Sequence, residues 1–148
     1  MLTALSFTGC TSNEDKSAQL TEFRNTVDTF CETIASLDSS INNAGDSDDT
    51  ASVLSNLDTL NTSFAEFASV DFPKDYDYLE NLADEAADYM STAVTSYHQA
   101  FEQCTDKESF ENKYNYAGEN YSRAYKRINV IVSFLNGETT DDATIVTE

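Results

Sequence analysis

Apolar residues recur every three and four positions along most of this chain, and that spacing constrains the fold more than any other feature. Such a repeat keeps one stripe of each helix facing a shared core. The clearest stripes are Leu20, Phe23, Val27, Phe30, Ile34, Leu37 and Ile41, then Val53, Leu57, Leu60, Phe64 and Phe67, then Phe110, Tyr114, Ala117, Tyr121, Ala124, Ile128, Ile131 and Leu135. A broader, alanine-rich stripe occupies residues 79–104. The spacing predicts helices over about 17–43, 47–70, 74–104 and 106–136.

Residues between the stripes indicate where each helix begins and ends. We expect Asn42-Asn43-Ala44-Gly45 to end the first helix and Pro73 to lie in the first turn of the third. Thr105 and Glu108 have the spacing of a capping box and are expected to begin the fourth helix, and Asn136-Gly137 is expected to end it. Short connections make successive helices antiparallel neighbours. Since neither hairpin could bury both of its stripes alone, the sequence predicts an all-α, antiparallel, up-down-up-down four-helix bundle with one core.

The charge is strongly negative, with 27 acidic against 8 basic residues and a net charge of −19. Such a surface repels nucleic acid and anionic lipid headgroups, so no nucleic-acid partner is expected. The basic residues gather on the last predicted helix, as Arg123, Lys126 and Arg127. This basic patch either pairs with acidic residues of neighbouring helices or faces an anionic partner.

The N-terminus carries an apolar run that ends in Phe7-Thr8-Gly9-Cys10, followed by a polar stretch. The chain thereby resembles the small helical lipoproteins of bacteria, a group with many members of unassigned function. The resemblance implies cleavage before Cys10, a lipid on its thiol as the only membrane contact, and an extracytoplasmic location. It further implies that 1–9 is a signal-peptide remnant and 10–16 a linker. The bundle then occupies 17–137, and 138–148 is an acidic tail that we expect to be disordered.

Two further cysteines, Cys31 and Cys104, invite a disulfide in an exported protein. Helix rise places them roughly 25–30 Å apart along the bundle axis, whereas a disulfide needs Cα atoms within about 7 Å. The alternative is two small buried apolar side chains. The spacing favours the second reading and leaves the first open.

No arrangement typical of catalysis is found along the chain. His98 and Glu102 share a helix face, but a metal site needs more ligands than these two. The acidic segment 46–50 lacks the glycine and terminal glutamate of a calcium loop. We therefore expect no enzyme, no metal and no cofactor.

Two aromatic groups remain as candidate binding features. Tyr97, Tyr114, Tyr121 and Tyr125 lie on or beside the last two stripes, opposite alanines. They either pack against those small residues or line a ligand slot. The second predicted helix is shorter than the third and fourth, so the last hairpin should overhang the first by roughly two turns. Phe101, Cys104 and Phe110 would then form an apolar overhang that needs a cover.

The sequence favours an extracytoplasmic, lipid-anchored bundle that acts as an interaction or structural module without catalysis, with an envelope protein as its partner. The alternative is a sensor or carrier that binds a small molecule or cation in the tyrosine slot.

Overall fold

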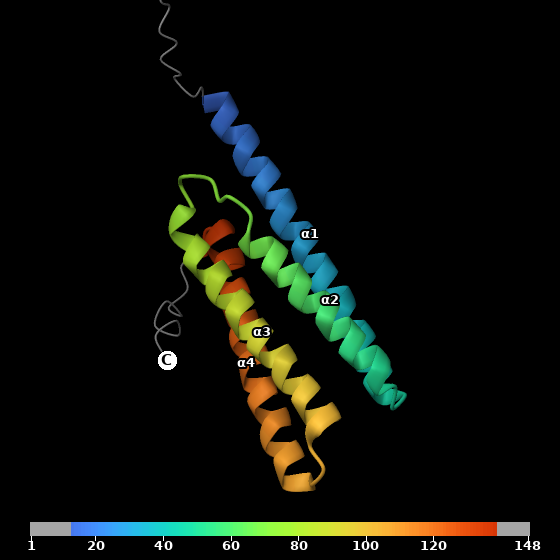
Figure 1. The fold of residues 1–148 in the computed structure, drawn as a ribbon. Coiled ribbons are helices and arrows are strands. Elements are labelled where there is room, and N and C mark those ends of the chain that lie inside the picture. Colours follow the sequence, from blue (N-terminus) through green and yellow to red (C-terminus); the bar gives the residue numbers. More distant parts are fainter. Residues whose placement is uncertain (1–12, 139–148) are drawn as a thin grey trace, which may run out of the picture.

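The computed structural model describes residues 13–138, and these residues form four α-helices with no strand among them (Figure 1). The helices are α1 (Asn13–Asp46), α2 (Thr50–Ala68), α3 (Glu80–Gln103) and α4 (Lys107–Leu135), and a short 3₁₀ helix, η1 (Asp77–Leu79), precedes α3. The all-helical prediction is confirmed. Each helix begins or ends a few residues away from its predicted bounds, for local reasons that follow.

The turn between α1 and α2 does not use the glycine that was predicted to end the first helix. Gly45 lies within α1, and the left-handed conformation falls instead on Asp48, with φ of 55°. Aspartate tolerates this region because its short polar side chain can bond locally. Asp49 then caps α2, because its carboxylate accepts hydrogen bonds from the Ser52 amide at 3.1 Å and hydroxyl at 2.6 Å.

The connection between α2 and α3 is longer than predicted, and the placement of Pro73 in a first helical turn was wrong. Pro73 lies in the loop, where its carbonyl accepts a hydrogen bond from the Tyr76 amide at 2.7 Å. The loop is fixed because Phe72 is buried and its amide donates to the Glu80 carboxylate at 3.0 Å. An inserted aromatic side chain thus ties this connection to the core.

The predicted Thr105 cap was also wrong, since Asp106 caps α4. Asp106 has an extended backbone, and its carboxylate accepts from the Ser109 amide at 2.8 Å. At the other end of α4, Gly137 adopts a φ of 72°, the left-handed conformation that glycine adopts without steric cost. The predicted Asn136-Gly137 stop is therefore confirmed.

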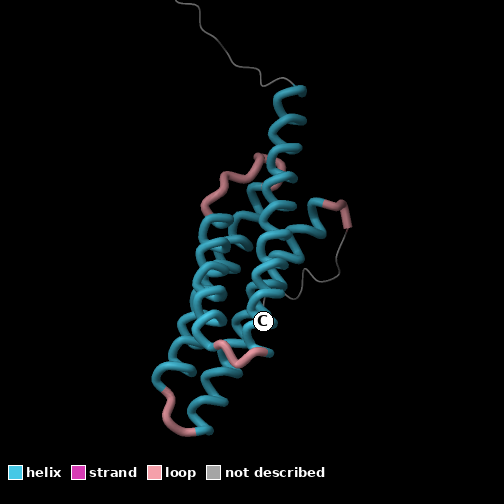
Figure 2. The backbone as a smooth tube through the Cα atoms, turned by 90° about the vertical axis from the view of Figure 1, so that its right-hand side faces the viewer, coloured by secondary structure: helices cyan, strands magenta, loops and turns pink. Residues whose placement is uncertain are grey.

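The four helices pack consecutively, α1 on α2, α2 on α3 and α3 on α4, with the most extensive packing between α3 and α4. Figures 1 and 2 show that the α3–α4 connection lies beyond the α1–α2 turn at one end of the molecule. At the opposite end, the first turns of α1 project past the α2–α3 connection. The two hairpins are thus offset along the bundle.

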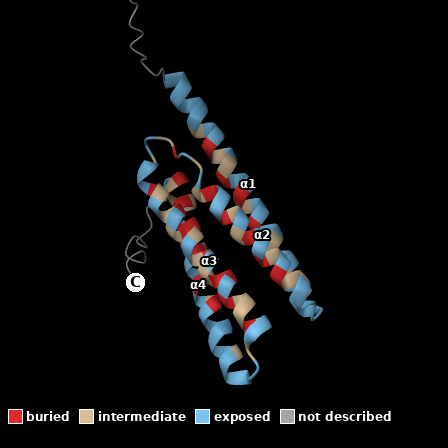
Figure 3. Ribbon diagram, in the orientation of Figure 1, coloured by how far each residue is buried: buried red, intermediate tan, exposed pale blue. Residues whose placement is uncertain are grey.

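The core runs through the middle of the molecule, where residues of all four helices are buried (Figure 3). The largest fully buried side chains are Phe64, Leu57, Leu60, Leu79, Met90, Ile128 and Ile131. Almost all of them lie on the heptad stripes. The projecting parts of α1 and of the last hairpin are mostly exposed, so the offset leaves helix surface open to solvent at both ends.

Candidate functional site

A cleft of about 560 Å³ is lined by the last turns of α1, the first part of α2 and the helices of the last hairpin. All four helices contribute to it, and its lining residues are Asp38, Ile41, Asn42, Gly45, Asp46, Val53, Leu57, Tyr97, Phe101, Tyr114 and Tyr121. Its volume falls in the range of small-molecule sites, about 300–1,000 Å³. Three of the four tyrosines that the sequence singled out meet here, together with carboxylates that it did not connect with them.

The aromatic rings of this cleft stand at steep angles to one another. The Tyr97 ring lies 5.2 Å from that of Tyr114 at 74°, and 6.5 Å from that of Tyr121 at 77°. Phe101 lies 6.0 Å from Tyr114 at 83°. Edge-to-face pairs of this kind are mutually attractive, so the rings hold one another in place.

Asp38 places a carboxylate beside the aromatic rings of this site. The Tyr121 hydroxyl donates a hydrogen bond to the Asp38 carboxylate, which joins α4 to α1. Burial, followed by this bond, raises the pKa of Tyr121. Burial and the neighbouring Tyr114 raise the pKa of Tyr97 to about 12. Both phenols are protonated at neutral pH, and their raised pKa values keep them protonated into the alkaline range as well.

Tyr125, the fourth predicted slot residue, does not line the cleft. Its ring stacks on Tyr121 with centroids 5.0 Å apart and packs edge-on against Phe64 at 5.6 Å. Its hydroxyl is buried and finds no hydrogen-bond partner within residues 13–138. Burial, followed by the neighbouring Tyr121 and Asp38, raises the pKa of Tyr125, although none of these contacts has good hydrogen-bond geometry. This tyrosine packs behind the cleft wall.

The aromatic rings of the predicted apolar overhang partly cover one another. Phe101, Cys104 and Phe110 are each half-buried, and the rings of Phe101 and Phe110 meet edge-to-face at 5.4 Å. Phe110 also stacks on Tyr114 at 5.6 Å. Cys31 and Cys104 carry free thiols, and burial raises the pKa of Cys31. The cleft and the overhang are therefore continuous through Phe101 and Tyr114.

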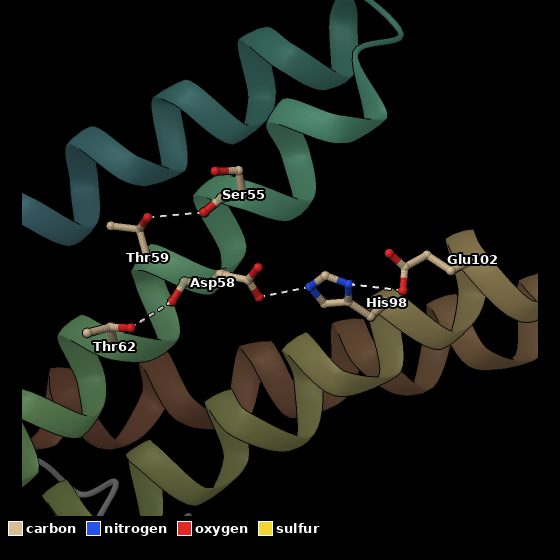
Figure 4. Close-up of polar contacts among 6 residues, drawn as sticks. All are labelled: Ser55, Asp58, Thr59, Thr62, His98 and Glu102. Atoms are coloured by element: carbon tan, nitrogen blue, oxygen red, sulfur yellow. Dashed lines mark hydrogen bonds and ion pairs between the residues drawn. The ribbon is translucent and has the colours of Figure 1, made fainter.

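His98 links the two hairpins beside this site (Figure 4). Its Nε2 lies 2.8 Å from the Asp58 carboxylate on α2, and its Nδ1 lies 3.3 Å from Glu102 one turn along α3. The hydrogen bond to Asp58 is the main reason that the pKa of His98 is raised, and Glu102 adds to it. Sequence spacing showed Glu102 but could not show Asp58, which is forty residues distant in the chain.

The three residues of the basic patch do not share one surface. Arg123 and Lys126 are exposed, whereas Arg127 is buried. The Arg127 Nε donates to Glu85 on α3 at 2.6 Å, and its guanidinium lies 4.3 Å from the Tyr89 ring centroid. Arg127 thus makes the internal pairing that was one of the two readings of this patch, and only Arg123 and Lys126 face solvent.

Metal ligands, membrane spans and the chain termini were also considered from the sequence. No group of three or more histidine, cysteine or acidic side chains within 13–138 could hold a metal ion. In the same part of the chain no helix is long and apolar enough to cross a membrane. Cys10 and most of the acidic tail lie outside the described residues.

No protein-family profile, curated protein or solved structure matches this chain. The site must therefore be judged by its own chemistry. Its lining combines aromatic rings, three apolar side chains that we call its floor (Ile41, Val53 and Leu57), and the carboxylates of Asp38 and Asp46. Such a set of groups can bind and orient a small molecule.

Proposed function

We propose that this protein is a non-catalytic binding module that holds a small molecule in the tyrosine-lined cleft. The observation that carries the proposal is the cleft itself, to which all four helices contribute. Depressions of about 570 and 430 Å³ elsewhere are lined by α1 alone or by α1, α2 and Val70, so the shared aromatic lining, and not the volume, distinguishes this cleft. The alternative that the sequence offered, a sensor or carrier, thereby becomes the leading candidate.

The proposal includes an antiparallel up-down-up-down arrangement of the helices. Two features support it: three-residue connections at 47–49 and 104–106, and the packing of each helix on the next along the chain. Connections this short favour antiparallel neighbours. In this arrangement the cleft lies at the end where the first hairpin turns.

The proposal also includes a lipid anchor on Cys10 outside the cytoplasmic membrane, supported by the Phe7-Thr8-Gly9-Cys10 motif. α1 begins at Asn13, shortly after this cysteine. At 1.5 Å per residue, Asp38 lies roughly 40 Å along α1 from its start. An anchored bundle would therefore present its cleft well away from the lipid surface. Replacing Cys10 with alanine should release the protein from the membrane fraction of expressing cells.

The experiment that tests the binding function blocks the cleft from within. Gly45 lines it, and a Cβ added there would meet nothing within 4 Å. Gly45→Trp should fill the cleft with its ring, whereas Gly45→Ala adds one methyl and serves as the matched control. Both keep a helical residue at this position.

The wild-type protein and both variants would be screened by amide NMR against a panel of amines, carboxylates, sugars and aromatic fragments. We expect at least one compound to shift the amides of Leu57, Tyr97 and Tyr121. That shift should persist in Gly45→Ala and disappear in Gly45→Trp. If no compound in the panel perturbs the cleft, or if Gly45→Trp binds as well as wild type, the proposal is wrong.

An interaction module remains the second candidate, because Arg123 and Lys126 stay exposed on an otherwise acidic protein. Two neighbouring cations can contact an acidic surface of an envelope partner. Replacing both with glutamate should abolish capture of such a partner. Unchanged capture would exclude this patch.

A further inference from the structure

We infer that the cleft selects an organic monocation, a ligand with an alkylated ammonium group and an apolar body. The inference rests on the proposed binding function and adds the chemical class of the ligand. It follows from three properties of the lining: the angles between its rings, the sign of its charges and the nature of its floor.

The rings provide faces in more than one direction. Tyr97 stands at 74° to Tyr114 and at 77° to Tyr121, so the ring of Tyr97 faces in a different direction from the other two. Ring faces carry negative electrostatic potential and attract cations within about 6 Å of the centroid. The Tyr97 and Tyr121 phenols are protonated at neutral pH, as tyrosines ordinarily are, so the attraction here comes from uncharged rings.

The charges of the lining are all of one sign. Asp38 and Asp46 line the cleft, and no lysine, arginine or histidine is among the lining residues. The Tyr121 hydroxyl donates to Asp38, which orients this carboxylate beside the aromatic wall. A carboxylate next to ring faces favours a cation and repels an anion. The net charge of −19 adds a long-range attraction for cations over the whole molecule.

The apolar side chains of the floor make the cleft a poor site for a bare metal ion. Ile41, Val53 and Leu57 offer only carbon, and no group of three metal-binding side chains exists within residues 13–138. A hydrated divalent ion would need more oxygen ligands than two separate carboxylates supply. An alkylated ammonium ion carries its own apolar surface and needs no ligand shell, so it matches both the floor and the rings.

The test uses two probes of the same shape that differ in charge. Choline has a quaternary nitrogen, and its neutral isostere dimethylbutanol has a quaternary carbon in the same place. Calorimetric titration should show choline binding at least about tenfold more tightly, a ratio within reach of a single desolvated cation–π contact. Added salt should weaken the choline complex and leave the neutral one unchanged.

A pair of variants with the same charge change locates the effect. Asp38→Asn keeps an acceptor for the Tyr121 hydroxyl but removes the charge beside the rings. Asp28→Asn makes the same change on an exposed part of α1 outside the cleft. We expect Asp38→Asn to weaken choline binding severalfold and Asp28→Asn to change it little, with thermal unfolding confirming that both remain folded.

The outcomes separate this inference from the function on which it rests. If choline and dimethylbutanol bind equally, or only an anionic or neutral panel compound binds, the cleft is a binding site but the inference that it selects cations is wrong. If choline binds equally well in Asp38→Asn and wild type, the assigned carboxylate is wrong and the inference fails. If no compound of either experiment binds, the inference and the proposed function fail together.

Discussion

Both ends of this bundle are built from aromatic rings, and they differ in whether those rings are packed or open. At the phenylalanine end, near the α2–α3 connection, Phe23, Phe30, Phe64, Phe67 and Phe72 are all at most 7% exposed. Phe30 stacks on Phe67 with centroids 4.2 Å apart, and Phe23 meets Phe72 at 4.5 Å. At the tyrosine end, around the cleft, Tyr114 is 43% exposed and the rings border a space of about 560 Å³.

The offset of the hairpins explains much of this difference. At the phenylalanine end, α1 extends past the connection and Phe72 inserts from the loop. At the tyrosine end, α1 and α2 turn back before the last hairpin does. Fewer neighbours remain to fill the space between the rings. Tyrosine suits such a place because its ring can pack while its hydroxyl reaches water or a polar partner. The heptad pattern is the same at both ends, so helix length decides which one closes.

The difference in packing between the two ends is tested most strongly by removing one large ring from each end. Phe64 is 1% exposed and touches Phe30 and Tyr125, so Phe64→Ala should lower the free energy of unfolding by about 3–5 kcal/mol. Tyr114→Ala should cost less, about 1–2 kcal/mol, because Tyr114 is 43% exposed and its removal breaks ring contacts but leaves no closed cavity. Urea unfolding followed by circular dichroism measures both. Equal losses would mean that the tyrosine end is as tightly packed as the other.

The packed end was largely predictable from the sequence. Phe23, Phe30, Phe64 and Phe67 lie on the heptad stripes, and a regular stripe specifies the buried face of a helix without further information. Phe72 was not predictable, because it lies in a loop outside any period. Turns were the weakest point. Whether Gly45 or Asp48 takes the left-handed conformation depends on differences of about 1 kcal/mol between neighbouring residues.

The open end was predictable only in part. The sequence marked Tyr97, Tyr114 and Tyr121 because they follow the stripes, but it gave no reason to connect Asp38 with them. One signal was present: Asp38 lies four residues after Ile34, at the edge of the first apolar stripe. Contacts between helices distant in sequence, such as Asp58 with His98 or Glu85 with Arg127, depend on helix rotation, which spacing alone does not fix. The same limit left open whether Arg127 pairs with an acidic residue of a neighbouring helix or faces an anionic partner.

A second prediction sharpens the comparison at the boundary between the two ends. The buried Tyr125 hydroxyl lies near Tyr121 and Asp38, which add to the effect of burial in raising its pKa, but it makes no hydrogen bond of good geometry in the described part of the chain, whereas Tyr121 donates to Asp38. An unsatisfied buried hydroxyl costs free energy that its removal recovers. Tyr125→Phe should therefore leave stability unchanged or raise it by up to about 1 kcal/mol, while Tyr121→Phe should lower it by about 1 kcal/mol.

Thermal and urea unfolding of these two variants provide the measurement, and each variant is the control for the other, since both lose one oxygen from stacked neighbouring rings. A loss of stability in Tyr125→Phe would show that its hydroxyl is satisfied after all. The wall behind the cleft would then be as polar as the cleft itself, and the division between the two ends would lie nearer the middle of the bundle.

The smallest expected effect concerns His98, which joins α2 to α3 on the tyrosine side. Its pKa is raised above the ordinary value of 6.5, chiefly by Asp58. The imidazolium therefore stabilises the folded state fully below about pH 6.5, and this contribution is lost as pH rises through the raised pKa of the folded protein. Because Asp58 and Glu102 are more than half exposed, solvent limits the effect to less than about 1 kcal/mol.

The chain contains one histidine, so its titration can be followed by NMR without assignment. We expect a pKa above 6.5 in wild type and a lower value in Asp58→Asn, while the exposed control Asp28→Asn should change it little. The difference in unfolding free energy between wild type and His98→Gln should shrink from about pH 5.5 to about pH 8.5. A histidine that titrates at its ordinary value, with a difference independent of pH, would mean that the hairpins are held by apolar packing alone on this side. The tyrosine end would then have no polar link between α2 and α3 to compensate for its open core.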